Sequence, residues 1–173
     1  MVKYFSEENM SNNKLKSEGV NIKSHRLSKK EIEDNFSDLH APLTQIEAII
    51  EADRCYFCYD APCTKACPSD IDVPGFIQSI RSDNLTGAAE KILSENIFGG
   101  MCARDCPTEE LCQQACVRND HEDKPVEIGL LQRYATDSVL DNGVKLFSRK
   151  KDTGKSIAVV GAGPAGISCA HLL

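Results

Sequence analysis

The sequence predicts a mainly α-helical domain, followed by the first strand and helix of an α/β fold. Two observations lead to this prediction. Between residues 72 and 141, apolar residues recur at i, i+3, i+4 and i+7, the period of a helix with one buried face. After residue 155 the pattern changes to a short β-branched run, 157–160, and then a glycine-rich turn.

A capping box marks where the first firm helix begins. In Thr44-x-x-Glu47 each side chain can satisfy a free backbone N–H of the other residue. The apolar residues Ile46, Ile49 and Ile50 are expected to mark one face of this helix. The helix would then deliver the chain to the first cysteine, Cys55.

Two amphipathic helices are predicted between two groups of cysteines. Asp72 can cap the first helix and Pro74 fits its opening turn. The second helix stops before Gly99-Gly100. The two helices would form a hairpin that returns the chain, so that the second cysteine group can meet the first. Their expected core residues are Val73, Phe76, Ile77 and Ile80, then Leu85, Ala88, Ala89, Ile92 and Leu93.

Two more helices and a charged linker complete the predicted organisation. A short helix is expected at Thr108, because Glu109 and Glu110 favour a helix N-terminus. A longer one is expected over about 127–141. Residues 1 to about 28 are polar and are expected to be a mobile tail. The predicted divisions are a polar N-terminal extension (1–42), a helical domain (43–147), a linker (148–155) and the start of a dinucleotide-binding domain (156–173).

Composition and charge narrow the classes of partner. The net charge of −6 argues against nucleic acid, since phosphate binding draws on clustered Lys and Arg. No apolar run approaches the roughly 20 residues that span a membrane, and the N-terminus lacks the apolar core of a secretory signal. A reducing, cytoplasmic location is therefore expected. In that compartment a cysteine-dense chain more often binds metal than forms disulfides.

Eight of the nine cysteines fall into two groups with tight internal spacing. Cysteines at i and i+4 on a helical turn point the same way, and a following proline ends the turn. Bacterial ferredoxins bind clusters through C-x2-C-x2-C-x3-C-P, and the first group has this form with a wider middle gap. The spacing thus favours iron–sulfur clusters and electron transfer. The groups are Cys55-x2-Cys58-x4-Cys63-x3-Cys67-Pro68 and Cys102-x3-Cys106-Pro107-x4-Cys112-x3-Cys116.

Zinc and disulfides are the alternatives at these cysteines. Structural zinc sites with four cysteines usually combine two C-x2-C knuckles, and only one occurs here. A zinc-stabilised module that docks subunits is therefore the alternative function. Spacing alone does not assign cysteines to sites, nor does it make all eight of them ligands. The ninth, Cys169, is expected to be a small packed residue.

Arginines near the cysteines are candidates for tuning a negatively charged cluster. Arg104 looks best placed, because it lies between Cys102 and Cys106 in the sequence. A solvated surface position is the alternative for each of them. The candidates are Arg54, Arg81, Arg104, Arg118 and Arg133.

The glycine-rich turn has the pattern Gly161-x-Gly163-x-x-Gly166. It follows a β-branched run and precedes a predicted helix, which is the context of a dinucleotide-binding turn. A pyrophosphate would sit at the helix N-terminus. The acidic ribose-binding residue expected about 20 residues further on would lie beyond Leu173. The sequence is therefore expected to be a truncated piece of a longer protein, unable to bind a dinucleotide unaided.

Four motifs extend these features into a family resemblance: Cys-Tyr-Asp-Ala-Pro-Cys at 58–63, Gly-Ala-Ala-Glu at 87–90, Cys-Ala-Arg-Asp-Cys-Pro-Thr at 102–108 and Ile-Gly-Leu-Leu-Gln-Arg-Tyr at 128–134. With the glycine-rich turn they resemble the flavoprotein electron-input module shared by the glutamate synthase small subunit and dihydropyrimidine dehydrogenase. The resemblance covers about residues 43–173. The stretch 60–63 and Gln132 resemble the bacterial NAD-dependent dihydropyrimidine dehydrogenase flavin subunit more closely.

The resemblance implies a fold and an activity. The fold would be a helical double [4Fe–4S] domain of the α-helical ferredoxin type, followed by the first β-α unit of a Rossmann-like FAD domain. In the longer protein NAD(P)H would reduce FAD, and electrons would pass through two [4Fe–4S] clusters to a catalytic partner subunit. That partner would be an FMN-containing dihydropyrimidine dehydrogenase subunit, which reduces uracil or thymine, or the glutamate synthase large subunit. The piece itself would not be catalytic.

The resemblance also implies ligands that cross between the two cysteine groups. Cys102 would be a near neighbour and not a ligand. Gln132 would be a ligand, and it lies beside a predicted inward stripe where an unpartnered polar group is costly. The alternative for Gln132 is a position on the helix margin in water. One cluster would take Cys55, Cys58, Cys63 and Cys116, and the other Cys67, Cys106, Cys112 and Gln132.

Overall fold

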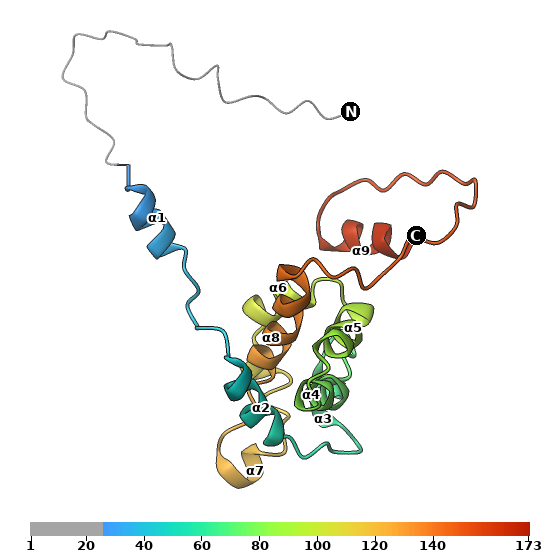
Figure 1. Cartoon of the computed structure of the whole chain (residues 1–173). Coiled ribbons are helices and arrows are strands. Elements are labelled where there is room, and N and C mark those ends of the chain that lie inside the picture. Colours follow the sequence, from blue (N-terminus) through green and yellow to red (C-terminus); the bar gives the residue numbers. More distant parts are fainter. Residues whose placement is uncertain (1–25) are drawn as a thin grey trace, which may run out of the picture. The chain divides into compact units, whose positions relative to one another are not determined.

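A computed structural model of the chain describes residues 26–173. The tail expected over residues 1 to about 28 lies almost wholly outside the described residues. The chain divides into two units, 1–39 and 40–173, and each is described by itself. The described residues form helices joined by loops, and no strand is formed among them (Figure 1).

The described part of the first unit contains one short helix, α1 (Lys29–Asn35). Ser28 caps it with a capping box, in which the Glu31 side chain accepts from the Ser28 backbone N–H at 2.8 Å. No residue of α1 is buried. This helix was not predicted inside the polar extension, although Ser28-x-x-Glu31 is a capping box like Thr44-x-x-Glu47.

The second unit is built around its longest helix, α8. This helix packs against α2, α4, α5 and α6, and α4 also packs against α2, α3 and α5. Figure 1 shows α4 and α5 together along α8. The elements of the unit are α2 (Gln45–Asp53), α3 (Pro62–Ala66), α4 (Val73–Arg81), α5 (Leu85–Glu95), α6 (Gly99–Asp105), the 3₁₀ turn η2 (Thr108–Glu110), α7 (Asn119–Glu122), α8 (Ile128–Asp141) and α9 (Pro164–Leu172).

The predicted hairpin of α4 and α5 is confirmed. Asp72 caps α4 by accepting from the Gly75 N–H at 3.0 Å, and Asn84 caps α5 in the same way through the Gly87 N–H at 2.9 Å. The expected apolar stripes face inward, apart from a half-buried Leu85. The two helices therefore bury one face each, α4 against α2 and α8, and α5 against α8. Their buried residues are Val73, Phe76, Ile77 and Ile80, and Ala88, Ala89, Ile92 and Leu93.

The start of α2 is confirmed, but its expected inner face is wrong. The Thr44 backbone N–H donates to Glu47 at 2.8 Å, as the capping box predicts. The residues that α2 buries completely are Ala48 and Ala52, whereas Ile46 is 72% exposed and Ile50 is 60% exposed. Small side chains at i and i+4 let the backbone of α2 approach α4 and α8 closely. Local pattern does not reveal which of two apolar stripes meets those neighbours.

The strand predicted over 157–160 is not formed. A strand needs a neighbouring backbone to satisfy its N–H and C=O groups, and the described residues provide none. The predicted helix does form as α9, with Pro164 in its first turn. Gly166 suits the tight approach, because a Cβ there would lie 2.2 Å from the Gly161 carbonyl oxygen. The Rossmann-like unit is thus not supported by this structure.

Cys169 also differs from expectation. It was predicted to be packed, but it is exposed, and α9 buries none of its residues. In an α/β fold such a helix packs against a sheet, and no sheet is present among residues 26–173. None of the described helices has the length and apolarity needed to cross a bilayer.

Candidate metal centre

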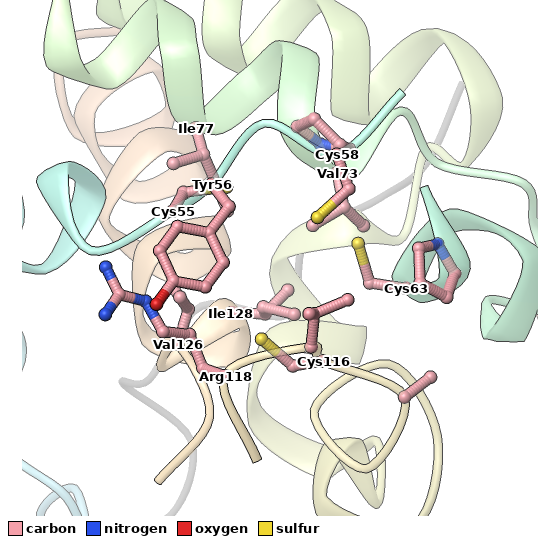
Figure 2. Close-up of a pocket in the computed structure, with 14 residues that line it drawn as sticks. Cys55, Tyr56, Cys58, Cys63, Val73, Ile77, Cys116, Arg118, Val126 and Ile128 are labelled. Atoms are coloured by element: carbon pink, nitrogen blue, oxygen red, sulfur yellow. The ribbon is translucent and has the colours of Figure 1, made fainter. Parts of the chain in front are cut away.

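Four thiols line one pocket, three from the first cysteine group and one from the second. Cys55 and Cys58 lie in the loop after α2, Cys63 lies in α3, and Cys116 lies in the turn before α7. Figure 2 shows the sulfurs of Cys58, Cys63 and Cys116 directed toward the same space. The pocket measures about 370 Å³, including space open to solvent. Its wall is apolar on one side, formed by Val73, Ile77, Val126 and Ile128.

The loop that carries the first thiols is shaped by two left-handed residues. Phe57 has φ +52° and Ala61 has φ +39°, a region that costs non-glycine residues about 1–2 kcal/mol each. The reversal at Phe57 points its backbone N–H at the Cys55 sulfur, at 3.4 Å. Ala61 precedes Pro62, which opens α3 and brings Cys63 into its first turn. The loop therefore adopts an unfavourable backbone conformation at two residues, and this conformation positions the sulfurs.

Pocket thiols affect the pKa values of their neighbours. The pKa of Cys63 is raised to about 11, mainly by burial and in part by the nearby Cys55 and Cys116 sulfurs. Burial also raises the pKa of Cys55, with Cys116 and Cys58 acting in the same direction. A neutral thiol is thus favoured until a cation replaces its proton. Thiolates are soft donors that suit iron–sulfur clusters and zinc, so this donor set fits a cluster.

A second set of thiols gathers at the ends of α3 and α6. Cys67 ends α3 and Cys106 ends α6. The pKa of the third thiol, Cys112, is raised to about 12, mainly by burial and in part by the sulfurs of Cys106 and Cys67. Burial likewise raises the pKa of Cys106, with contributions from Cys102 and Cys67. These sulfurs are therefore close enough to repel one another as thiolates.

Within residues 26–173, no three His, Cys, Asp or Glu side chains converge as one metal ion would require. The four pocket thiols are instead distributed around a space.

Gln132 lies inside the core, not on a helix margin. It is 7% exposed on α8, and its Nε2 donates to the Gly99 carbonyl oxygen at 2.7 Å. Gly99 is buried on α6, where a Cβ would lie 2.4 Å from Ile92. With the amide nitrogen directed at Gly99, the amide oxygen is the atom of this side chain able to serve as a metal ligand. Its predicted ligation stays a prediction.

Cys102 has a protein partner of its own. Its sulfur accepts from Asn96 Nδ2 at 3.2 Å, and the same nitrogen contacts Ser69 Oγ at 3.4 Å. Its thiol raises the pKa of Cys106, so it lies beside the second set. The family resemblance predicted that Cys102 lies near a cluster without binding it. The contact with Asn96 could not be predicted from the sequence.

Residues 32–144 match the profile of a family described as dihydropyrimidine dehydrogenase domain II, 4Fe-4S cluster. The chain belongs to this family. The resemblance identified from the sequence is therefore confirmed. Residues 32–144 therefore form an iron–sulfur domain of this family.

Relatives of this iron–sulfur domain agree with the family. The NAD-dependent dihydropyrimidine dehydrogenase subunit PreT of Escherichia coli K12 is 44% identical over 142 residues, which is 82% of this chain and 34% of the relative. PreT of Salmonella typhimurium is 43% identical over the same shares. The putative oxidoreductase UacF of Escherichia coli is 34% identical over 150 residues, 86% of this chain and 23% of the relative. The chain thus spans about a third of PreT and less of UacF.

The arginine beside the pocket of this iron–sulfur domain is Arg118. Arg104, which the sequence favoured, instead donates to Asp137 on α8 at 2.8 Å and to the Gly100 carbonyl at 2.9 Å. Arg118 lines the pocket with its guanidinium 3.9 Å from the centre of the Tyr56 ring. The residues that place it there, Tyr56 and Arg54, are distant in sequence, so spacing could not rank Arg118 above the other candidates.

The glycines of the predicted dinucleotide turn lie at the N-terminal end of α9. Gly161 has φ +111°, and Gly163 is the N-cap residue directly before Pro164. Gly161 and Gly163 therefore precede the helix, and Gly166 lies in its first turn. Dinucleotide binding by these residues stays a prediction, since the strand before them is not formed.

Proposed function

We propose that this domain conducts single electrons through two [4Fe–4S] clusters, from a reduced flavin to a partner catalytic subunit. One observation carries the proposal: Cys116, from the end of the second cysteine group, lines the same pocket as Cys55, Cys58 and Cys63. A pocket that recruits one thiol from the other group is what crossed ligation requires. The family description, which names a 4Fe-4S cluster, supports the same conclusion.

The proposed ligand sets follow this crossing. The pocket would hold one cluster, and the coupled pKa values of Cys106 and Cys112 support a second set that includes Cys67. Gln132 would complete the second set, leaving Cys102 outside it. The proposed sets are Cys55, Cys58, Cys63 and Cys116 for the first cluster, and Cys67, Cys106, Cys112 and Gln132 for the second.

When bound, the clusters would supply one-electron redox chemistry, and the protein residues would perform the rest. The thiols would lose their protons and hold iron as thiolates. The apolar wall, with Val73, Ile77 and Ile128, limits water around the first set. Replacing one thiolate by the neutral amide of Gln132 would remove a negative charge from the second site and shift its potential.

The wider electron path is proposed from the relatives. PreT is named as an NAD-dependent dihydropyrimidine dehydrogenase subunit. By analogy NAD(P)H would reduce an FAD held by a Rossmann-like domain that begins at residue 156. The electrons would end on an FMN-containing partner subunit that reduces a pyrimidine, in the cytoplasm. Glutamate synthesis is the alternative destination, and a zinc-stabilised docking module is the alternative function.

Metal analysis of anaerobically purified protein tests this proposal. We expect a brown protein with roughly eight irons and eight acid-labile sulfides, the content of two [4Fe–4S] clusters. A colourless protein holding about two zinc ions, each bound by four ligands, would contradict the redox function.

A further inference from the structure

Arg118 is the charged residue among those described in the wall of the thiol pocket. The other lining residues are apolar, tyrosine or cysteine side chains. Figure 2 shows Arg118 next to the Tyr56 ring, on the side of the pocket formed by Val126. A fixed positive charge at this position interacts electrostatically with any metal or cluster that the four thiols bind.

Three contacts hold the guanidinium of Arg118 in place. It stacks on the Tyr56 ring at 3.9 Å, its Nε donates to the Arg54 carbonyl oxygen, and its Nη1 pairs with Glu122. The Arg118 side chain is 14% exposed. An arginine does not lose its proton in proteins, so this position keeps a positive charge that water screens only weakly.

The surrounding charges reduce but do not remove the effect of Arg118. Glu122 also pairs with Arg54, which in turn pairs with Glu51 at 2.6 Å. Glu122 is 40% exposed, so water screens its charge more than that of Arg118. The guanidinium of Arg118 lies beside the Cys55 loop, because it donates to the carbonyl oxygen of Arg54 and stacks on Tyr56, the residues directly before and after Cys55.

We propose that Arg118 raises the reduction potential of the cluster bound at this pocket, and that Glu122 limits the increase. The inference rests on the proposed function. The step is [4Fe–4S]²⁺ + e⁻ → [4Fe–4S]⁺, with the electron supplied by a reduced flavin, or by dithionite in a titration. Four thiolates already make the site negative, and reduction adds one more negative charge. A fixed positive charge therefore stabilises the reduced state more than the oxidised one.

The test is a dithionite titration of the anaerobically purified full chain, followed by electron paramagnetic resonance. Arg118→Gln should lower the potential of one cluster, with a shift of about tenfold in the reduction equilibrium, or 59 mV for one electron. Glu122→Gln should shift the same signal in the opposite direction and by less. The signal of the other cluster serves as an internal reference. Mere loosening of the loop would move both variants in the same direction.

Two further variants act as controls. Arg118→Lys keeps the charge and should stay near the wild-type potential. Arg81→Gln removes a matched charge, since Arg81 pairs with Asp53 and stacks on Phe57 at 5.6 Å, but its side chain is 53% exposed. We expect less than a twofold shift for Arg81→Gln, because water screens an exposed charge.

The outcomes separate this inference from the proposed function. Wild-type protein without iron overturns both. Eight irons in the wild type with equal shifts in Arg118→Gln and Arg81→Gln overturn the inference alone. If Arg118→Gln fails to retain iron, Glu122→Gln decides: a raised potential supports the inference, and an unchanged or lowered one overturns it.

Discussion

Burial sets the protonation of the cysteines before any metal binds. It is the largest cause of the raised pKa values at Cys55, Cys63, Cys106 and Cys112. In metal-free protein these thiols are neutral at pH 7. Binding must therefore displace protons, and cluster assembly will depend on pH.

The raised pKa values predict that metal-free protein loses stability in alkali. A thiol whose pKa rises from 9.0 to about 11 or about 12 on folding stabilises the fold below pH 9. This contribution is lost as pH rises through 11 and 12. We expect the melting temperature of wild type to fall more steeply above pH 9 than that of a Cys63→Ala/Cys112→Ala variant. Parallel pH profiles, measured by circular dichroism, would contradict this prediction.

Ligand identity is testable one cysteine at a time. Cys102→Ser should keep its iron, because we place Cys102 outside both ligand sets, where it accepts from Asn96. Cys106→Ser should lose about half of its iron, the share of one of two equal clusters. Iron and sulfide analysis after anaerobic purification measures both. Equal loss from the two variants would overturn the crossed assignment.

At the scale of elements, capping residues were reliable guides. Thr44, Asp72 and their partners predicted where α2 and α4 begin, because a cap satisfies backbone groups within a few residues. The apolar stripes of α4 and α5 were also predictable, since each helix offers one clear stripe. The sequence of α2 offers two, and the structure buries the alanine stripe.

The choice of stripe in α2 predicts unequal effects of substitution. Ala48→Leu should destabilise the protein by about 1–3 kcal/mol, because Ala48 is fully buried and a larger side chain overpacks its contact. Ile50→Ser should change stability by no more than about 0.5 kcal/mol, because Ile50 is 60% exposed. Urea denaturation of both variants measures the difference. A larger loss in Ile50→Ser would show that the isoleucine stripe is the buried one.

At the scale of the whole second unit, two kinds of interaction hold the chain together. The helices α4, α5 and α8 bury apolar residues such as Phe76, Ile92 and Leu131. The cysteine loops are joined by polar contacts, in which Arg54 reaches the carbonyls of Lys124 and Pro125. The helical core is therefore less dependent on metal than the loops are.

Removing metal should show how far the helical core and the cysteine loops each depend on it for stability. After chelation under anaerobic, reducing conditions, we expect most of the helical circular dichroism signal to remain, because the apolar contacts among α4, α5 and α8 do not require bound metal. The melting temperature should fall markedly, since metal bound only by the folded state stabilises it. A complete loss of helical signal at room temperature would contradict this division. Unchanged melting would show that the thiols hold no stabilising metal.

The sequence by itself determined the mainly helical class and the places of α2, α4, α5 and α8, because these depend on periodicity and caps within a few residues. It did not predict the short helices α1, α3, α6 and α7. Tertiary structure decided features that depend on distant neighbours. It buried Ala48 in place of Ile46, placed Arg118 in the wall of the thiol pocket, and left 157–160 without a strand partner. Local propensity is encoded within one turn of chain, whereas these outcomes depend on which surfaces meet after the chain has folded.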